Sequence, residues 1–265
     1  MDIIGLAVLG AVCGLVVGMT STGGGSMLTP GLILLGVPAS VAVGTDLLIA
    51  SVMKLFGGGI YALRGEVHWP TVRWLACGSI PGALLGVWLL NRLSSVRMEL
   101  FLQKAVGGAL LLAGSSLLLR VLWRPGISRR AMPRPGVTVV LGAAVGVLVS
   151  ITTIGSGSLL LCVLAVLFPL APPALVGTDL VHALLLSSTA TLAQLASGRV
   201  DFPLAACVLL GGIPGVLIGA KLASRVPERA MRGGLACVLV GLGLHFALSE
   251  KSHVPPPMVA EHTQE

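Results

Sequence analysis

Long apolar runs, separated by short stretches of charged residues, proline and glycine, make up most of the chain between residues 3 and 248. A helix needs about 20 residues to cross the hydrocarbon core of a membrane, and several of the runs reach that length. The pattern therefore predicts an all-α integral membrane protein with about ten helical segments. Their expected bounds are 3–19, 26–36, 41–63, 71–90, 98–122, 136–151, 158–170, 174–197, 203–223 and 230–248.

Four of these segments are too short to cross a membrane comfortably, and they occur as two adjacent pairs. The first pair is 3–19 and 26–36, and the second is 136–151 and 158–170. Gly, Ser and Thr residues interrupt each pair. Such interruptions are typical of broken or re-entrant helices that line a binding site. The pattern leaves open whether the short segments cross the membrane or re-enter on the same side.

An internal repeat relates the two pairs and the segments that follow them. Val43–Leu47 and Val176–Leu180 have the same sequence, Val-Gly-Thr-Asp-Leu, and Ser21–Ser26 aligns with Thr153–Ser158. Further blocks recur in the same order at a nearly constant offset, including Ile80-Pro81-Gly82 and Ile213-Pro214-Gly215. A repeat of this kind indicates that residues 1–122 and 136–248 are two halves of one fold.

Each half has an odd number of segments, so the second half is expected to insert upside down relative to the first. The charges agree if the basic linker 123–135 is cytoplasmic, since cytoplasmic loops carry an excess of Lys and Arg. Both termini then face outside, and the tail 249–265 is expected to be disordered. The basic residues expected inside are Arg64, Arg73, Arg120, Arg124, Arg129, Arg130, Arg134, Lys221, Arg225, Arg229 and Arg232, against Arg92, Arg97 and Arg199 outside.

Composition excludes several classes of protein. The chain has 265 residues, of which 55% are hydrophobic and only 10% charged, with 36 glycines. Soluble domains have about 25% charged residues, so a soluble enzyme, a disordered chain and a nucleic-acid binder are all excluded. The net charge of +7 marks topology rather than nucleic-acid binding. The five cysteines lie in apolar segments without a CxxC motif, and they are expected to be buried and unpaired.

The two interruptions are the candidate substrate site. Inverted repeats place such sites near the bilayer midplane, where the halves meet. A helix that restarts after a break presents free N–H groups and a partial positive charge, which suit a small oxyanion. Close packing of helices through small residues is the alternative explanation. The candidate substrate-binding residues are Thr20, Ser21, Thr22, Gly23, Gly24, Gly25 and Ser26, together with Thr153, Gly155, Ser156, Gly157 and Ser158.

Two carboxylates inside apolar runs are candidates for ion or proton coupling. Asp46 and Asp179 follow Gly-Thr near the start of their segments, where Asp also serves as a helix N-cap. His182 lies three residues after Asp179 and shares its helix face, whereas Ile49 occupies the equivalent position of the first half. The pair is therefore not a symmetric structural device, and a proton relay through Asp179 and His182 stands beside the N-cap explanation as an interpretation.

Two further polar residues lie inside apolar segments. Lys54, whose counterpart in the second half is Ser187, is expected either to attract an anionic substrate or to pair with Asp46 or Asp179. Gln194 is expected to join helices by hydrogen bonding. No catalytic constellation, metal-ligand spacing or cofactor motif is present in the sequence. We therefore expect a protein that is not an enzyme and that uses no cofactor.

The sequence resembles the sulfite exporter TauE/SafE family, also called the toluenesulfonate uptake permease family. The resemblance rests on Thr20–Ser26 with Pro30 after it, on Val43-Gly44-Thr45 and on Ile80-Pro81-Gly82, with their second copies, and it covers about residues 1–248. Asp46 and Asp179 stand where many members have a small or hydroxylated residue.

This resemblance implies a multi-pass permease of the bacterial inner membrane. It also implies a substrate such as sulfite, sulfoacetate or a sulfonate, and coupling to an ion gradient, commonly proposed to be protons. Two alternatives are a passive anion channel of the same architecture and a membrane scaffold or sensor subunit. The expected partners are the small anion and membrane lipid, with no nucleic acid, and the expected assembly is a monomer or homodimer.

Overall fold

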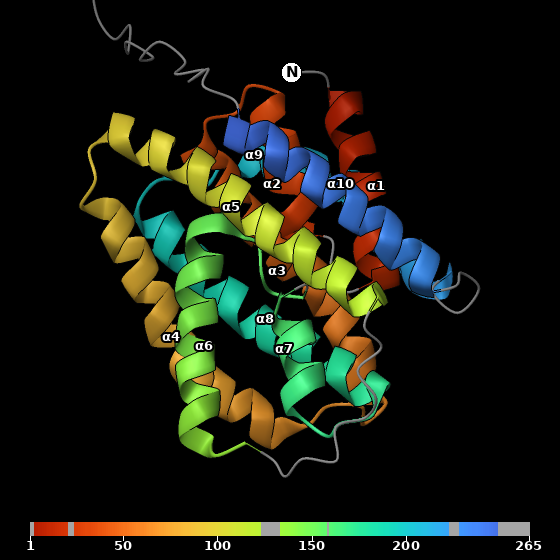
Figure 1. Cartoon of the computed structure of the whole chain (residues 1–265). Coiled ribbons are helices and arrows are strands. Elements are labelled where there is room, and N and C mark those ends of the chain that lie inside the picture. Colours follow the sequence, from red (N-terminus) through yellow and green to blue (C-terminus); the bar gives the residue numbers. More distant parts are fainter. Residues whose placement is uncertain (1–2, 21–23, 123–132, 158, 223–227, 249–265) are drawn as a thin grey trace, which may run out of the picture.

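The computed structural model describes residues 3–20, 24–122, 133–157, 159–222 and 228–248, and these form ten α-helices (Figure 1). All ten expected segments are present, and the all-α prediction is confirmed. The helices are α1 Ile3–Thr20, α2 Gly24–Leu34, α3 Ala39–Leu63, α4 Trp69–Asn91, α5 Ser95–Leu122, α6 Pro135–Thr152, α7 Leu159–Leu167, α8 Pro172–Ala196, α9 Phe202–Leu222 and α10 Glu228–Leu248.

Within the described residues, six helices are long and apolar enough to cross a membrane: α3, α4, α5, α6, α8 and α9. The inclusion of α6 corrects the expectation that segment 136–151 is too short, because the helix extends over 18 residues. The helices that follow the two interruptions are half-length, with 11 residues in α2 and 9 in α7. The predicted linker 123–135, except for its last three residues, and the predicted disordered tail 249–265 lie outside the described residues.

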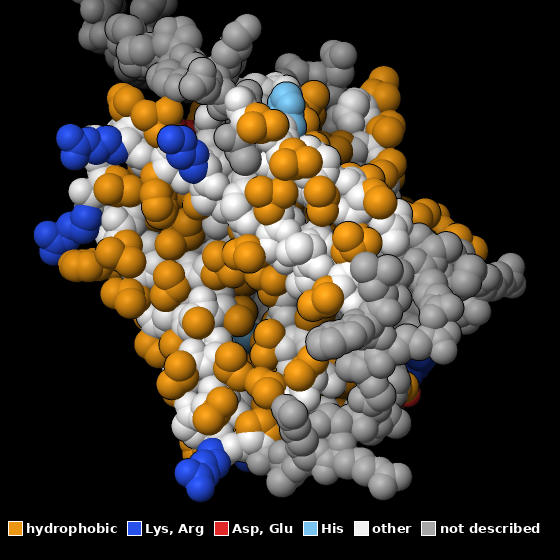
Figure 2. All heavy atoms as spheres, viewed as in Figure 1, with side chains coloured by type: hydrophobic (Ala, Val, Ile, Leu, Met, Phe, Trp, Pro, Cys, Tyr) orange, Lys and Arg blue, Asp and Glu red, His pale blue; other side chains and the backbone are white. Residues whose placement is uncertain are grey.

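The outer surface of the helices is largely apolar. Hydrophobic side chains cover the middle of the face in Figure 2, and Lys and Arg side chains lie at its upper left and lower margins. This distribution fits a body surrounded by lipid with charges near the water interfaces. Cys77 and Cys237 are also exposed, which corrects the expectation that all the cysteines are buried, whereas Cys13 is buried as expected.

Helices α3 and α8 form the centre of the molecule. Their apolar windows are 72% and 67% buried, more than those of the other candidate spans. Leu180 of α8 contacts Gly58 of α3, and Ser51 of α3 contacts Thr191 of α8, so the two helices run antiparallel. Most of the buried polar side chains discussed below belong to this pair. Helices α5 and α10 lie side by side across one face of the bundle (Figure 1).

Glycines bring α1 against α9, and α4 against α6, at backbone contact. A Cβ added to Gly10 would lie 2.0 Å from the carbonyl oxygen of Val208, and one added to Gly78 would lie 1.9 Å from that of Val139. Only glycine permits this approach, and small residues commonly mediate close packing of membrane helices. Both pairs run parallel, and each joins a helix of one half to a helix of the other.

In each Val-Gly-Thr-Asp-Leu motif, the glycine and the threonine contact a turn of the opposite half. Gly44 lies against the carbonyl of Arg199, and Gly177 against that of Glu66, so that an added Cβ would come within 2.2 Å and 2.0 Å of the oxygens. The Thr45 hydroxyl accepts a hydrogen bond from the Asp201 N–H at 3.0 Å. The Thr178 hydroxyl accepts the equivalent bond from the His68 N–H at 2.9 Å. The two motifs are therefore used alike in packing.

Candidate substrate and ion site

The interruption in the second half is a true helix break. Helix α6 ends at Thr152, and α7 begins at Leu159. Thr153 has φ 60°, and Gly155 and Gly157 have φ 120° and 106°, all in the left-handed region that a continuing helix does not use. Glycine reaches these values without strain, whereas Thr153 is held there by its contacts.

The first interruption lies between α1 and α2. Ser21, Thr22 and Gly23 lie outside the described residues, as does Ser158 in the second half, and the side chain of Thr20 is not described either. Gly24 is the first residue of α2, and Ser26 is buried in its first turn. A Cβ on Gly25 would come within 2.4 Å of the Thr153 carbonyl oxygen, so this glycine lets α2 pack on the break in the second half.

Lys54 reaches from α3 to the second break. Its Nζ donates a hydrogen bond to Ser156 Oγ at 2.7 Å, and the side chain is buried. Lys54 also interacts electrostatically with Asp46 and Asp179. A buried ammonium beside a hydroxyl at a helix break is a feature that can hold a small anion. The structure thus brings together Lys54 and Ser156, which the sequence placed 102 residues apart.

Asp46 lies at one end of a chain of hydroxyl groups that extends to two backbone carbonyls. Thr29 of α2 donates its hydroxyl proton to Asp46 Oδ2, and its Oγ1 lies 2.6 Å from Thr153 Oγ1. Thr153 Oγ1 is also 3.3 Å from the Gly25 carbonyl oxygen and 2.6 Å from that of Thr152. Asp46 is fully buried, and its Oδ1 has no hydrogen-bond partner among the described residues.

Asp179 has different surroundings. His182, one turn further along α8, is fully buried, and its Nε2 lies 2.9 Å from Ser79 Oγ of α4. The other ring nitrogen, Nδ1, has no hydrogen-bond partner among the described residues. Asp179 is also buried, at 1% exposure. The two aspartates therefore share a sequence motif and not an environment.

Neither aspartate caps a helix. The N-cap positions are Pro38 for α3 and Ala171 for α8, so Asp46 and Asp179 lie two turns inside their helices. The N-cap explanation is therefore wrong, because Pro38 and Pro172 start each helix earlier than its apolar run begins. A carboxylate in this position has no free helix N–H groups to accept from, and it needs partners from other segments.

Antiparallel packing of α3 and α8 separates the two aspartates. Leu180, next to Asp179, lies against Gly58, which is about 18 Å along α3 from Asp46. Lys54 lies between these levels. The buried centre thus has one ammonium flanked by a carboxylate toward each side of the membrane.

Sequence reasoning missed two residues of this centre, Thr29 and Ser79. Neither residue is itself repeated, since Cys162 and Gly212 occupy the positions offset by 133 residues. Their signal is a lone hydroxyl in an apolar run, which is common in membrane helices. Gln194 behaves as expected, because its Nε2 donates to the Ser150 carbonyl of α6 at 3.2 Å.

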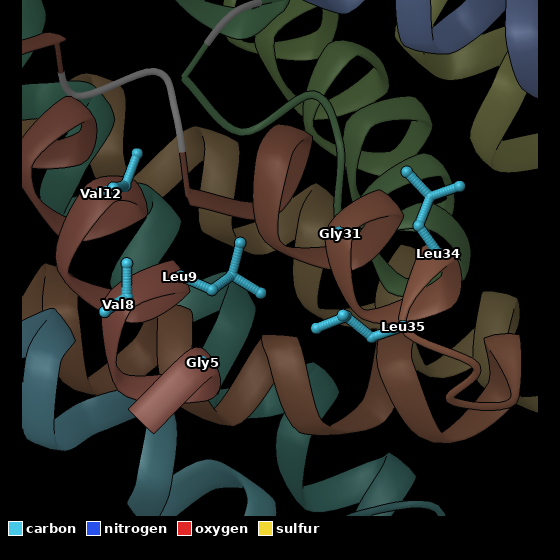
Figure 3. A pocket seen from close by; sticks show the side chains of 7 residues that line it. All are labelled: Gly5, Val8, Leu9, Val12, Gly31, Leu34 and Leu35. Carbon is cyan, nitrogen blue, oxygen red and sulfur yellow. The ribbon is translucent and has the colours of Figure 1, made fainter. Parts of the chain in front are cut away.

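An apolar groove lies apart from this polar centre. It has a volume of about 420 Å³ and runs between α1 and α2 (Figure 3). Its lining residues are Gly5, Val8, Leu9, Val12, Gly31, Leu34 and Leu35, all of them apolar. A groove with such a lining offers no group that would bind an anion.

Comparison with known proteins agrees with this architecture. Residues 6–246 match the family described as sulfite exporter TauE/SafE. The chain is 35% identical over 253 residues to the probable membrane transporter protein YjnA of Bacillus subtilis, covering 91% of this chain and 98% of the relative. It is 26% identical over 253 residues to the probable membrane transporter protein YunE of the same organism, covering 86% and 90%.

A probable membrane transporter protein of Xylella fastidiosa is 27% identical over 223 residues, covering 82% of this chain and 83% of the relative. No solved structure matches the chain. The matches span nearly all the described helices, including both halves. The chain therefore belongs to the sulfite exporter TauE/SafE family and is a membrane transporter.

Proposed function

We propose that this protein is a permease of the bacterial inner membrane that moves a small sulfur-containing anion, such as sulfite, sulfoacetate or a sulfonate, together with protons. The observation that carries the proposal is the buried contact between Lys54 and Ser156 at the helix break. An ammonium this deep in an apolar body is costly, and a transported anion repays part of that cost.

The break supplies the remaining groups that an oxyanion needs. Gly155 and Gly157 take the backbone out of the helix, and α7 starts directly afterwards with the positive end of its dipole. Ser156 adds a hydroxyl next to the ammonium. A sulfite or sulfonate group has three oxygens that can accept hydrogen bonds from such donors at the same time. This chemistry supports the substrate class implied by the family.

The charges of the centre support coupling to a cation. Asp46 and Asp179 carry two negative charges against the single ammonium of Lys54, and an arriving anion adds one more. In a medium of low dielectric constant this excess is strongly unfavourable unless positive charge enters too. His182 and Asp179 are the groups through which we propose that a proton enters with the substrate.

The directions of the helices support two halves with opposite orientation. Equivalent helices of the two halves, α3 and α8, run antiparallel, and so do α5 and α10. Transporters built in this way open their central site alternately to the two sides by rocking one set of helices against another. We propose that the site between α3 and the second break is exposed in this manner.

Transport by the purified protein in liposomes tests the proposal. Lys54→Met should abolish accumulation of the labelled anion driven by a pH gradient, because the substrate loses its buried counter-charge. Lys104→Met is the matched control, since Lys104 is an exposed cation on the membrane helix α5. Sulfite, sulfoacetate and toluenesulfonate should be compared as substrates.

Two outcomes would contradict the proposal. Normal accumulation by Lys54→Met would remove the residue from the site. Anion flux that only equilibrates across the membrane, with no accumulation under a pH gradient of either direction, would identify a passive channel.

A further inference from the structure

We propose that the oxygens around Asp46 form a binding site for a monovalent cation, sodium, separate from the proton pathway at Asp179 and His182. The site consists of the Asp46 carboxylate, the hydroxyls of Thr29 and Thr153, and the carbonyls of Gly25 and Thr152. It joins α2 and α3 of the first half to the helix break of the second half.

The first argument is a shortage of protons at this site. Thr29 donates its hydroxyl proton to Asp46 Oδ2. Thr153 has one proton for three acceptors within 3.3 Å, namely Thr29 Oγ1 and the carbonyl oxygens of Gly25 and Thr152. The two hydroxyl protons and the Thr29 N–H, which also acts on the Asp46 carboxylate, are fewer than the six oxygens at this site. Buried acceptors without donors are destabilising, and a small cation contacted by all of them removes the deficit.

The second argument is the orphaned oxygen of Asp46. The side chain is completely buried, and Oδ1 has no hydrogen-bond partner among the described residues. Lys54 acts on Asp46 electrostatically, but its ammonium donates its hydrogen bond to Ser156. A buried carboxylate in this condition needs either a proton or a metal ion. The surrounding oxygens are hard ligands, which suit an alkali or alkaline-earth ion.

The third argument is the helix end at the site, whose negative dipole also favours a cation. Thr152 and Thr153 stand at the C-terminal end of α6, where the last carbonyls lack intrahelical partners and the dipole is negative. Thr153, at φ 60°, ends the helix here, and its carbonyl oxygen lies against the first turn of α2. Unwound carbonyls at such half-helix C-termini bind sodium in transporters with inverted repeats.

The charge of the site favours a monovalent ion. One carboxylate supplies a single negative charge, and Lys54 lies close enough to lower the local negative potential. Divalent calcium sites in proteins use several carboxylates. A sodium ion therefore balances Asp46, whereas a divalent ion would leave an excess of positive charge in the buried centre.

Use of this ion to drive transport rests on the proposed function, but its binding does not, so binding is tested first. The melting temperature of the purified protein in detergent should rise by about 5–10 °C when choline chloride is replaced by sodium chloride at constant total chloride and fixed pH. Potassium chloride should have a much smaller effect, because the oxygens are drawn close together and suit the smaller ion.

Substitutions connect the effect to the site. Thr29→Val removes one ligand at nearly constant volume and should weaken the sodium midpoint about tenfold, a loss typical of one coordinating group. Thr29→Ser keeps the hydroxyl and should restore it. Thr189→Val is the matched control, because the Thr189 hydroxyl donates to the Leu185 carbonyl of its own helix and lies outside the group of residues around Asp46. Asp46→Asn should remove the response altogether.

Equal melting temperatures of the wild-type protein in sodium, potassium and choline would overturn the inference and would leave a proton on Asp46. A sodium response unchanged by Thr29→Val would also overturn it. If sodium stabilises the protein but no sulfur anion is transported, the proposed function fails while the cation site stands. If transport proceeds without any sodium response, only the cation site fails.

Discussion

The two copies of Val-Gly-Thr-Asp-Leu, Val43–Leu47 and Val176–Leu180, share their packing and differ in their chemistry. In each copy the glycine lies against a backbone carbonyl of the other half, and the threonine accepts a hydrogen bond from an N–H in the same turn. The aspartates that follow face unlike neighbours, since Thr29 and Thr153 surround Asp46, whereas His182 follows Asp179 by one turn.

This difference indicates which part of a duplicated motif is under a geometric constraint. Gly44 and Gly177 have no room for another side chain, so both halves must keep glycine there. The aspartates are constrained only by what surrounds them, and surrounding residues such as Thr29 and His182 differ between the halves, where Cys162 and Ile49 occupy the equivalent positions. One duplicated segment therefore places two aspartates in different chemical surroundings on the same backbone frame.

The largest effect is expected from filling the glycine contacts. Gly44→Ala and Gly177→Ala each place a Cβ about 2 Å from a carbonyl oxygen, and both should lose at least about 3 kcal/mol of stability and most of the folded protein. Monodispersity after detergent extraction and the melting temperature measure this. Gly59→Ala on the same helix as Gly44, with no atom within 4 Å of the added Cβ, should behave like the wild type. If only one of the two variants is impaired, the motifs are not equivalent in packing.

The next largest effect is expected from replacing each of the two aspartates separately. Asp179→Asn should reduce accumulation driven by a pH gradient to the equilibrium level while the sodium-dependent stabilisation persists, because the relay loses its carboxylate and the cation site keeps its own. Asp46→Asn should abolish the sodium-dependent stabilisation while leaving accumulation driven by a pH gradient. Accumulation in liposomes and melting curves on the same preparations check both. Identical losses in the two variants would mean that both aspartates serve a single ion.

Replacing His182 with isoleucine makes the second half resemble the first at this position, where residue 49 is Ile. We expect His182→Ile to weaken pH-driven accumulation several-fold without changing substrate affinity, because the buried imidazole is the proposed partner of Asp179. Ser79→Ala, which removes only the hydroxyl partner of His182, should have a smaller effect. An unaltered pH profile in His182→Ile would remove this residue from the relay.

The smallest effect is expected from replacing Thr45 and Thr178, whose hydroxyls accept equivalent hydrogen bonds in the two motifs. Thr45→Val and Thr178→Val each leave one N–H, of Asp201 or His68, without its acceptor and should cost about 1–3 kcal/mol. The two losses should be similar and should leave the ion dependence unchanged. Melting temperatures compared with Thr189→Val measure the difference. A change in ion dependence in either variant would show that these hydrogen bonds and the ion site are coupled.

The sequence was sufficient for the helices and for the location of the second break. Apolar runs bounded by proline and charge mark all ten elements, because lipid demands helices and permits few polar interruptions. Gly155, Ser156 and Gly157 mark the break, because glycine is favoured where φ becomes positive. The first residue of a helix is harder to predict, because proline is tolerated in the first turn. For this reason the sequence also permits the incorrect N-cap explanation for Asp46 and Asp179.

The hydrogen-bond partners within the site cannot be predicted from the sequence. Thr29 and Thr153 are 124 residues apart, and Ser79 and His182 are 103 apart, so nothing local connects them. The repeat predicts that the halves meet but not which faces do, and Thr29 and Ser79 have no counterpart that the repeat would point to. Their roles follow only from the packing of α2 on the second break, where Gly25 lies against the Thr153 carbonyl, and from the contact between α4 and α8.

Those glycine contacts also set an order of assembly during synthesis. Gly78 and Val139 are 61 positions apart, whereas Gly10 and Val208 are 198 apart. At translation rates of about 5–20 residues per second, α6 emerges within seconds of α4, but α1 waits roughly 10–40 s for α9. During that interval the glycine face of α1 has no helix to receive it. The α4–α6 side of the centre can therefore close early, while the opposite side stays open until the second half is almost complete.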